Sequence, residues 1–534
     1  MSEALMLLIN FNQFRCARLP RHFSQSQPVH SRSFERHASA FDKSQVAAPK
    51  ALSFEDLGLH PPIVSSLQAA FPDIRRPTQA QGKLIPAVLS GQDILLQDQT
   101  GSGKSFGLVL ALLNKPRVEK RKSQKATITS VFIVPHRDLA YQFHNWVRRM
   151  FQPAASASSP SISSIAQVLV RDSRGSGLSV LHENPPHLLF ATPQALMDMW
   201  REEPDALQLR TLSAIVVDEA DYLIETVDYS ASTSRKPRRL KRKQHPGDTR
   251  AFLDIVYGNN ARPVDDEYVP PERDRSPQLI VSSATLPSHL IEYVCEESSW
   301  LVRDTWVSIT DDTSRSRQPR SRVSHSVLVV CDDHVRNITG AGPPAPVLDD
   351  APSASTEVEA DDPVLEFDAP LVEKYAQTAS PFNPLAMETI AMVFAADVPS
   401  IALLVIPSAL PIQRAVFELR QVGVNAHGLD LWKDRPVRRG AVRENPTLLV
   451  CTWANMRGLD VVGLTHVFVL GLPDDASGGA TAYVHIAGRV GRLESTDRRR
   501  GGKVVTVVEE GQEEAVRRML KWICGEASEM TIGL

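Results

Sequence analysis

The sequence has no paired cysteines, no excess of basic charge and no long apolar run. Its five cysteines form no Cys-x-x-Cys pair and stand far apart, at Cys16, Cys295, Cys331, Cys451 and Cys524. This spacing argues against a zinc site or a disulfide framework and suits a reducing compartment. No apolar run reaches the roughly 20 residues that a bilayer-spanning helix needs, so we expect no membrane span. The formal net charge is -3, so any surface that binds nucleic acid must be local.

The composition is that of a globular chain with room for more than one core. Its 534 residues are 42% hydrophobic and 23% charged, which is ordinary for folded proteins. A chain of this length accommodates two or three domains. The patterns described below divide it into residues 1–48, 49–310 and 311–534.

Residues 1–48 differ from the rest of the chain in their charge. They contain six basic residues but only three acidic ones, and serine is frequent. Leucine, isoleucine and phenylalanine between residues 5 and 14 are compatible with one apolar helical face beside the arginines. An arginine-rich, serine-rich and acid-poor start is typical of a mitochondrial transit peptide. The alternative is an ordinary disordered tail.

The stretch from Asp93 to Ser105 has the pattern of a phosphate-binding loop. An apolar run, interpreted as a buried strand, leads into a turn of small residues that ends in Gly-Lys-Ser, and a helix-compatible run follows. Glycines let successive backbone N–H groups point into one anion-binding concavity, and the helix N-terminus adds positive dipole. Lys104 is predicted to reach the β- and γ-phosphates and Ser105 to bind Mg²⁺. The residues expected to contact the nucleotide are Asp98, Gln99, Thr100, Gly101, Ser102, Gly103, Lys104 and Ser105.

Further apolar runs downstream also end in polar residues. Strands are predicted at residues 127–134, 188–191, 214–217 and 278–281. Because they alternate with helical patterns, we expect a parallel sheet with helices on both faces. Ligands of such sheets bind beyond the carboxyl ends of the strands. The polar residues expected along that edge are Pro135, Arg137, Thr192, Pro193, Asp218, Glu219, Ser283 and Thr285.

Two residues upstream of the phosphate loop are candidates for binding a base. A glutamine side chain can bond adenine N6 and N7 together, which makes Gln81 a candidate adenine reader. The aromatic ring of Phe54 is a candidate for stacking on the base. A glutamine near a helix start is more often a surface residue, so this hypothesis depends on the neighbouring loop.

The second half of the chain repeats the alternation of strands and helices without a phosphate loop. Strands are predicted at residues 326–330, 401–406, 447–450 and 466–470. Arg489 and Arg492 stand three residues apart near a predicted helix and could reach a phosphate from a facing domain. The alternative for this pair is a solvated helix face.

Two inserts are expected to lack fixed structure. Residues 225–249 contain the basic run 235–243, while residues 333–372 are acidic and rich in proline and alanine. The basic run is compatible with electrostatic attachment to RNA, with a nuclear-import signal, or with a solvated loop.

Taken in order, the motifs resemble those of the DEAD-box RNA helicases of superfamily 2. Residues 218–221 read Asp-Glu-Ala-Asp, residues 283–285 read Ser-Ala-Thr, and residues 100–105 match the phosphate loop. Residues 135–140 resemble the family's Pro-Thr-Arg-Glu-Leu-Ala motif, with His136 in place of threonine. The resemblance extends from Phe54 to about Cys524 and implies an α/β fold of two tandem RecA-like domains.

The resemblance also implies a role for each matching residue. ATP and Mg²⁺ are the implied ligands, with Ser105 and Asp218 holding the metal ion and Phe54 and Gln81 selecting adenine. The implied catalytic residues are Lys104, Asp218, Glu219, Ser283, Thr285, Arg489 and Arg492, and Asp460 joins the nucleotide site. The implied RNA contacts are Pro135, Arg137, Thr192, Pro193, Thr452, Arg457 and Gly458.

The sequence departs from the family pattern at several motif positions. Asp98 replaces alanine or glycine, Gln194-Ala195 replaces Gly-Arg, Trp432 replaces glutamine, Trp453 replaces aspartate and Ile486 replaces arginine. Arg489 and Arg492 remain, so we expect ATP hydrolysis to persist. Because Ile486 removes a charge expected near the meeting point of the two domains, we expect unwinding of long duplexes to be weak. On this reasoning Ile486→Arg should strengthen unwinding.

The resemblance predicts RNA-stimulated ATP hydrolysis that remodels RNA or RNA–protein complexes. With residues 1–48, the chain is similar to mitochondrial, fungal-type members, which act in mitochondrial RNA metabolism and assembly of the large ribosomal subunit. The implied setting is the matrix, with single-stranded or structured RNA, ribosomal RNA and assembly proteins as partners of a monomer. The rival hypothesis is an ATP-gated RNA-binding assembly factor with little or no unwinding activity.

Overall fold

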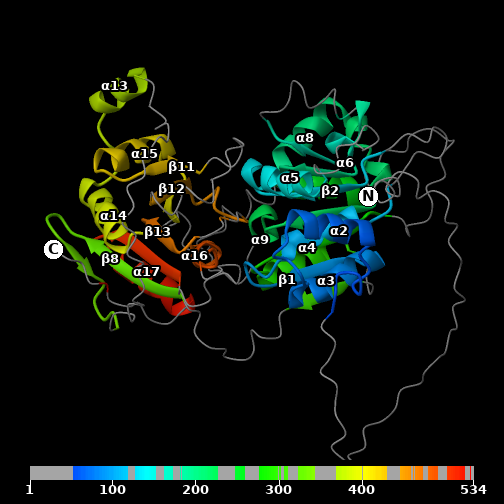
Figure 1. Ribbon diagram of the computed structural model, residues 1–534, viewed down its shortest axis with the longest axis horizontal. Helices are drawn as coiled ribbons and strands as arrows, with labels where there is room; N and C mark the ends of the chain where they lie inside the picture. The colour runs from blue at the N-terminus through cyan, green and yellow to red at the C-terminus, as the bar shows by residue number, and fades with distance from the viewer. Residues whose placement is uncertain are drawn as a thin grey trace, which may run out of the picture.

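Two sheets, each covered by helices, lie side by side along the long axis of the molecule in a computed structural model (Figure 1). The residues that the structure describes are 52–117, 127–151, 161–171, 181, 183–226, 247–258, 276–298, 300–301, 306–310, 323–342, 369–399, 401–429, 446–458, 461, 464–472, 479–490, 502–523 and 530. The expectations for residues 1–48, for the basic run and for the central part of the acidic insert lie outside these ranges.

The first sheet has seven strands in the order β3-β4-β2-β5-β6-β1-β7. All its neighbouring strands run parallel, as the alternation of strands and helices predicts. The strands are β1 (Ile94–Gln97), β2 (Ser130–Ile133), β3 (Ala166–Leu169), β4 (Leu188–Ala191), β5 (Ala214–Asp218), β6 (Gln278–Ser283) and β7 (Val307–Thr310).

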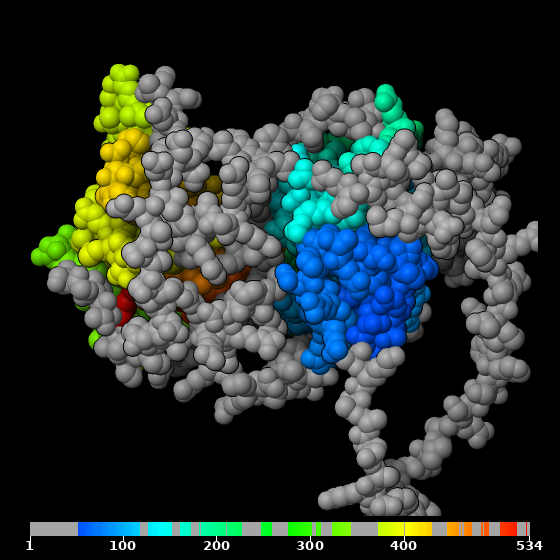
Figure 2. All heavy atoms as spheres, in the orientation of Figure 1, coloured from blue at the N-terminus to red at the C-terminus, as the bar shows by residue number. Residues whose placement is uncertain are grey.

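Helices cover both faces of this sheet. One face carries α2 (Pro61–Ala70), α3 (Gln79–Ser90), α4 (Lys104–Leu113), α5 (Arg137–Phe151) and α6 (Ile162–Ile165). The other face carries α8 (Pro193–Glu202), α9 (Ala220–Leu223), α11 (Asp248–Tyr257) and α12 (Ser288–Glu292), with the 3-10 helices η4 (Pro204–Leu207) and η5 (Leu209–Thr211) and the π-helix η8 (Tyr293–Glu297). In Figure 2 the blue atoms near the start of the chain adjoin cyan atoms above them.

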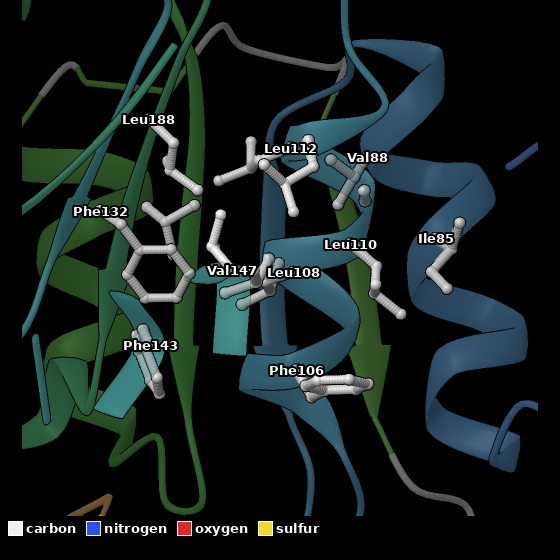
Figure 3. Packing of buried hydrophobic residues seen from close by; sticks show 14 of the residues in the cluster. Ile85, Val88, Phe106, Leu108, Leu110, Leu112, Phe132, Phe143, Val147 and Leu188 are labelled. Atoms are coloured by element: carbon white, nitrogen blue, oxygen red, sulfur yellow. The ribbon is translucent and has the colours of Figure 1, made fainter. Parts of the chain in front are cut away.

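The helix α4 sits at the centre of the first face and fixes the position of the phosphate loop. Its residues from Phe106 to Leu113 are all buried, and an all-apolar helix must be covered on every side. Figure 3 shows its leucines between α3, which contributes Ile85 and Val88, and the sheet. Phe132 of β2 and Phe143 of α5 meet edge to face with ring centroids 5.0 Å apart.

The second sheet has the order β11-β12-β10-β13-β14-β8-β9 and is parallel except between β8 and β9. Its strands are β8 (Val323–Val330), β9 (Val335–Asn337), β10 (Ile401–Ile406), β11 (Ala426–Gly428), β12 (Thr447–Thr452), β13 (His466–Leu470) and β14 (Gly502–Glu509). The helices α14 (Pro384–Asp397) and α15 (Ile412–Gln421) contribute to one core cluster, and α16 (Gly479–Ala487) and α17 (Glu513–Ile523) to the other. No helix in the described ranges combines the length and apolar character needed to cross a membrane.

The structure confirms the predicted strands and corrects the limits of both inserts, since α11 begins at Asp248, inside the range 225–249. Residues 335–337 form β9, which pairs antiparallel with β8, and α13 (Ala369–Gln377) begins before residue 372. The expectation that residues 333–372 lack structure is therefore wrong at both ends. The strands β3, β7, β9, β11 and β14 were not predicted, since they are short or lie beside Ser-rich and charged segments that obscure the apolar pattern.

Candidate functional site

The carboxyl ends of three adjacent strands bring the predicted site residues of the first domain together. In the sheet register Gln97 of β1 lies beside Ser283 of β6, and Asp218 of β5 lies beside Ser282. The phosphate loop follows β1 and ends at the N-terminus of α4. Residues from three distant parts of the chain therefore surround one loop, as the strand-end argument predicted.

The loop has the backbone conformation of an anion-binding turn. Gly101 and Gly103 adopt φ of 81° and 86°, in the left-handed region that favours glycine. The buried Lys104 donates from Nζ to the carbonyl oxygens of Asp98, at 2.5 Å, and Gln99, at 2.6 Å. Burial lowers the pKa of Lys104, and nearby carboxylates, Glu219 first, oppose this shift. A phosphate entering the loop would replace these two carbonyls as the partner of the ammonium group.

The hydroxyl of Ser105 and the carboxylate of Asp218 face each other beside the loop. Ser105 Oγ donates to Asp218 Oδ2 over 2.6 Å. Burial, and next the carboxylate of Glu219, raise the pKa of Asp218 to about 6, although Ser105 and Lys104 favour its ionised form. Hydroxyl and carboxylate oxygens are the hard ligands that Mg²⁺ prefers, so these two residues fit the metal site expected of them.

Glu219 is held in a strained backbone conformation. It directly follows β5 and precedes α9 with φ of 55° and ψ of 45°. A non-glycine residue in the left-handed region costs about 1–2 kcal/mol, and such strain concentrates at functional sites. The conformation directs the chain away from the sheet immediately after Asp218, so that both acidic side chains remain beside the phosphate loop.

Asp221 contacts residues of both domains. It accepts hydrogen bonds from Ser283 Oγ at 2.6 Å and from Thr285 Oγ1 at 2.7 Å, both in its own domain. From the second domain, Arg457 Nη1 lies 3.3 Å and His485 Nε2 3.5 Å from Asp221 Oδ2. Burial alone would raise the pKa of Asp221, but the nearby imidazole of His485, with the Arg457 guanidinium and the Ser283 hydroxyl, holds it well below its usual range.

The helix α16 carries further contacts across the interface, and it faces α9 in Figure 1. His485 Nδ1 lies 3.1 Å from Glu219 Oε2, and Arg489 Nη2 lies 3.9 Å from Glu219 Oε1. Glu219, the expected catalytic acid, and Arg489, one of the two arginines expected to reach a phosphate, are therefore neighbours, although 270 positions separate them in the sequence. Asp460 and Arg492, expected at the same site, lie outside the described residues, as does Trp432.

Glu219, Asp221 and His485 also resemble a metal centre, since one ligand atom from each lies within 4.8 Å of the others. The two ring nitrogens of His485, however, face two different carboxylates. The guanidinium of Arg457 already neutralises Asp221. We therefore interpret this group as a charge network that joins the domains.

The structure places both residues of the proposed adenine-binding pair in buried surroundings. Phe54 is 1% exposed and belongs to the core beneath α2, so its ring is not available to stack on a base. Gln81 is 3% exposed. Its Oε1 accepts from Thr78 N at 3.0 Å, and its Nε2 donates to Gly103 O at 3.1 Å. Gln81 therefore ties the start of α3 to the phosphate loop.

The residues expected to contact RNA differ in their exposure to solvent. The side chain of Arg137 is 50% exposed at the start of α5. Pro193 and Thr452 are buried at the ends of β4 and β12, beside Thr192 and Trp453. Pro135 and Gly458 lie in the segments that follow β2 and β12.

The structure shows a second set of neighbours for Arg457, which was expected to contact RNA. Its side chain pairs with Asp221 and lies over the ring of Tyr222, with 4.8 Å between guanidinium carbon and ring centroid. The guanidinium therefore belongs to the domain interface, and a contact between Arg457 and RNA stays a prediction.

Two departures from the family pattern lie in the core. Ile486 is 1% exposed and, with the buried Trp453, belongs to the apolar cluster under α16 and α17. The expectation that Ile486 leaves a missing charge at the meeting point of the domains is wrong, because its side chain points into the second domain. Among the described residues no hydrogen-bond partner is found for Trp453 Nε1.

Sequence reasoning missed several residues that hold the site. His136 forms a hydrogen bond with the second domain, as described below. The only sequence feature that marked it was a histidine where the family motif has threonine. Tyr483 Oη lies 3.1 Å from His325 Nδ1 and 3.2 Å from Thr506 Oγ1, which anchors α16 to β8 and β14. No local pattern marks these contacts, because each joins segments far apart in the sequence.

Two family profiles match this sequence. The one described as "DEAD/DEAH box helicase" covers residues 78–293, and the one described as "Helicase conserved C-terminal domain" covers residues 435–494. The human protein named "Probable ATP-dependent RNA helicase DDX28" is 30% identical over 253 residues, which cover 43% of this chain and 44% of that protein. "ATP-dependent RNA helicase DBP9" of Pyricularia oryzae is 32% identical over 205 residues, covering 38% and 30% respectively. The chain thus matches less than half the length of these relatives.

Solved structures share the fold over nearly the whole chain. S. cerevisiae Dbp5 bound to RNA and ADP BeF3 superposes with a TM-score of 0.56 at 16% identity, covering 90% of this chain and 96% of that one. Mss116p bound to ssRNA and AMP-PNP gives a TM-score of 0.56 at 18% identity, covering 90% and 81%. At this level of identity the likeness confirms the predicted pair of α/β domains.

Proposed function

The chain belongs to the DEAD-box family of ATP-dependent RNA helicases, and we propose that it hydrolyses ATP to remodel RNA or RNA–protein complexes. The observation that carries this proposal is the meeting of the two domains at Glu219. Lys104, Asp218 and Glu219 come from one domain, and His485 and Arg489 reach the same acid from the other. Such a site is complete only when both domains are together.

In this proposal each side chain has one task. Lys104 exchanges its two carbonyl partners for the phosphates of ATP, and Ser105 and Asp218 hold Mg²⁺, which neutralises phosphate charge when bound. Glu219 orients the attacking water and accepts its proton. Arg489 faces Glu219 from the second domain and would stabilise charge on the transferring phosphoryl group. Arg492 is proposed as its partner.

Asp221 would carry the signal between nucleotide and RNA. It joins Ser283 and Thr285 to Arg457, and Arg457 follows Thr452, one of the proposed RNA contacts. Arg137, Pro135, Thr192 and Pro193 lie at strand ends of the first domain and would contact the RNA backbone. Backbone contacts carry no sequence code, so the proposed substrate is single-stranded or structured RNA as a class.

Phosphate release with and without single-stranded RNA tests this function. We expect Mg²⁺-dependent hydrolysis that RNA stimulates and EDTA abolishes. Glu219→Gln keeps the shape of the acid and should lower turnover by roughly 10³-fold, because it removes the proton acceptor. Absence of hydrolysis in the wild type with RNA bound tightly in the presence of ATP would favour the second candidate, an ATP-gated RNA-binding assembly factor. Trp453 and Gln194-Ala195, which depart from the family pattern, motivate that alternative.

We further propose a mitochondrial matrix location, from the composition of residues 1–48. The proposed domains are residues 49–310 for ATP binding and 311–534 for the second RecA-like domain, in a monomer. Mitochondrial ribosomal RNA and ribosome-assembly proteins are the proposed partners. A reporter carrying residues 1–50 should enter mitochondria and be cleaved. A reporter that stays cytosolic or enters the nucleus would contradict this location and favour the basic run at 235–243 as the address.

A further inference from the structure

His136 makes a hydrogen bond between the two domains that no motif assigns. It stands between β2 and α5 in the first domain, and its Nε2 lies 2.7 Å from the backbone carbonyl oxygen of Arg457 in the second. We propose that His136 is a positioning residue that stabilises the closed arrangement of the two domains by donating this hydrogen bond. The inference rests on the proposed function only for the choice of ligands that drive closure.

The neighbours of His136 determine which ring nitrogen carries the hydrogen. The backbone N–H of Leu139 donates to Nδ1 over 3.3 Å, so Nδ1 acts as an acceptor. In a neutral ring the hydrogen then resides on Nε2, which faces the Arg457 carbonyl. Burial lowers the pKa of His136 to about 4, which keeps the ring neutral near pH 7. The backbone at the start of α5 therefore sets the tautomer that donates the interdomain bond.

A second contact shows that the two segments are closely packed at this point. Gly458, next to Arg457, has φ of +74°, and a Cβ built on it would lie 2.4 Å from Leu139 Cδ2. Real Cβ atoms do not approach other atoms so closely, so only glycine permits this approach. The His136 bond therefore lies in a water-excluding contact, where a lost partner costs more than at an exposed surface.

The bond holds Arg457 from its backbone while Asp221 holds its side chain. Arg457 Nη1 pairs with Asp221 Oδ2 at 3.3 Å, and Asp221 also accepts from Ser283 and Thr285. On the other side His136 is adjacent to Arg137, whose side chain is half exposed. His136 thus links a proposed RNA contact to the charge network at the catalytic acid.

The histidine is suited to this link by its length. A threonine, which the family motif has at this position, carries its hydroxyl one bond from Cβ and does not extend as far as the imidazole Nε2. Glutamine carries an amide N–H at a distance from the backbone similar to that of Nε2. Phenylalanine matches the ring in size but has no donor. These three properties define a matched pair of variants, His136→Gln and His136→Phe.

The test measures domain closure in the full chain by fluorescence transfer between labels at Asp73 and Glu388, which are exposed in the first and second domains. AMP-PNP is held at saturation and a single-stranded RNA is titrated. His136→Phe should need about tenfold more RNA for half-maximal closure, since a buried carbonyl loses its partner. His136→Gln should stay within about threefold of the wild type. Circular dichroism melting shows whether each variant is folded.

Gly458→Ala probes the same contact without changing His136. Its Cβ would meet Leu139 when the domains are together, so it should raise the RNA requirement by a similar factor, and the melting temperature shows the separate cost of alanine at a φ of +74°. If His136→Phe closes like the wild type, or if His136→Gln is as impaired as His136→Phe, the proposal is overturned. A wild type that never closes with AMP-PNP and RNA overturns it too. A wild type that closes, responds to these variants and yet fails to hydrolyse ATP would refute the proposed function and leave this inference supported.

Discussion

Asp221 and Arg457 form a buried ion pair between the two domains, with 3.3 Å between Oδ2 and Nη1. Their side chains are 2% and 9% exposed. Breaking a buried pair by removing one partner costs roughly 3–5 kcal/mol, because the remaining charge stays buried and unpaired. Opening of the domains would give both charges back to water, so the ion pair favours closure only while both partners are present.

The first prediction concerns this pair. Arg457→Gln and Asp221→Asn should each lower RNA-stimulated turnover roughly 100-fold, as expected for a loss of about 3 kcal/mol. The double variant should be less impaired than the sum of the two, because neither charge is then unpaired. Steady-state phosphate release measures all three. Arg171→Gln is the control, since it removes an exposed ion pair with Asp198 at 3.1 Å and should change turnover less than about twofold. Fully additive effects would mean that the pair does not act as a unit.

The second prediction concerns Gln81. Because its amide bonds Thr78 and Gly103, Gln81→Ala should loosen the phosphate loop and raise the KM for ATP and GTP alike, by roughly three- to tenfold. Thr78→Ala is the matched variant. Thr78 Oγ1 accepts from Gln81 N at 3.2 Å and donates to Ser102 O at 2.7 Å. Unlike the amide of Gln81, a single hydroxyl cannot bond adenine N6 and N7 together. A Gln81→Ala effect confined to ATP, with Thr78→Ala neutral, would restore the adenine-reading interpretation.

The third prediction concerns Ile486. Since its side chain lies in the second domain's core, Ile486→Arg should lower the free energy of unfolding by several kcal/mol and should not improve unwinding. Ile486→Val, which removes one methylene group, should cost about 1 kcal/mol. Urea denaturation measures both. Trp453→Asp buries the opposite charge in the same cluster, so the double variant Trp453→Asp, Ile486→Arg should lose less than the sum of the singles. A stable Ile486→Arg protein with faster unwinding would show that the side chain faces the domain interface.

The fourth prediction concerns pH. Burial lowers the pKa of His187 to about 4, and its Nε2 donates to Leu112 O over 2.9 Å. Between pH 6.5 and 4 the unfolded chain binds a proton at this residue and the folded chain does not. The contribution of neutral His187 to the free energy of unfolding is therefore complete above pH 6.5. It is lost as the pH falls towards 4, by up to about 3 kcal/mol.

His187→Gln keeps a donor for the Leu112 carbonyl but does not titrate. It should therefore lose less stability than the wild type as the pH falls over this range. Urea midpoints at pH 7 and 4.5 provide the comparison. The raised pKa of Asp218 acts in the opposite direction, but it is present in both proteins and cancels in the difference. Parallel pH profiles for the two proteins would contradict the prediction.

Local sequence determined the fold and the position of the site. The apolar strand before Asp98 and the glycines of the loop predicted the strand, turn and helix that the structure has from Ile94 to Leu113. The polar residues after β5 and β6 were expected on one sheet edge, and Asp218 and Ser283 do lie there. These features depend on periodicity and on backbone freedom within a few residues, so neighbours in the sequence are sufficient to predict them.

Only the tertiary structure decided which side chains are available and which domain each one serves. The side chains of Gln81 and Phe54 have suitable chemistry for binding a base. Packing, however, buries the ring of Phe54, and the amide of Gln81 bonds to the phosphate loop. Ile486 and Arg457 lie in motifs, but one faces a core and the other faces Asp221. The bond from His136 joins residues 321 positions apart. Which side chains are buried, and which residues they bond, depends on the packing of distant segments. The residue types along one stretch of chain do not determine it.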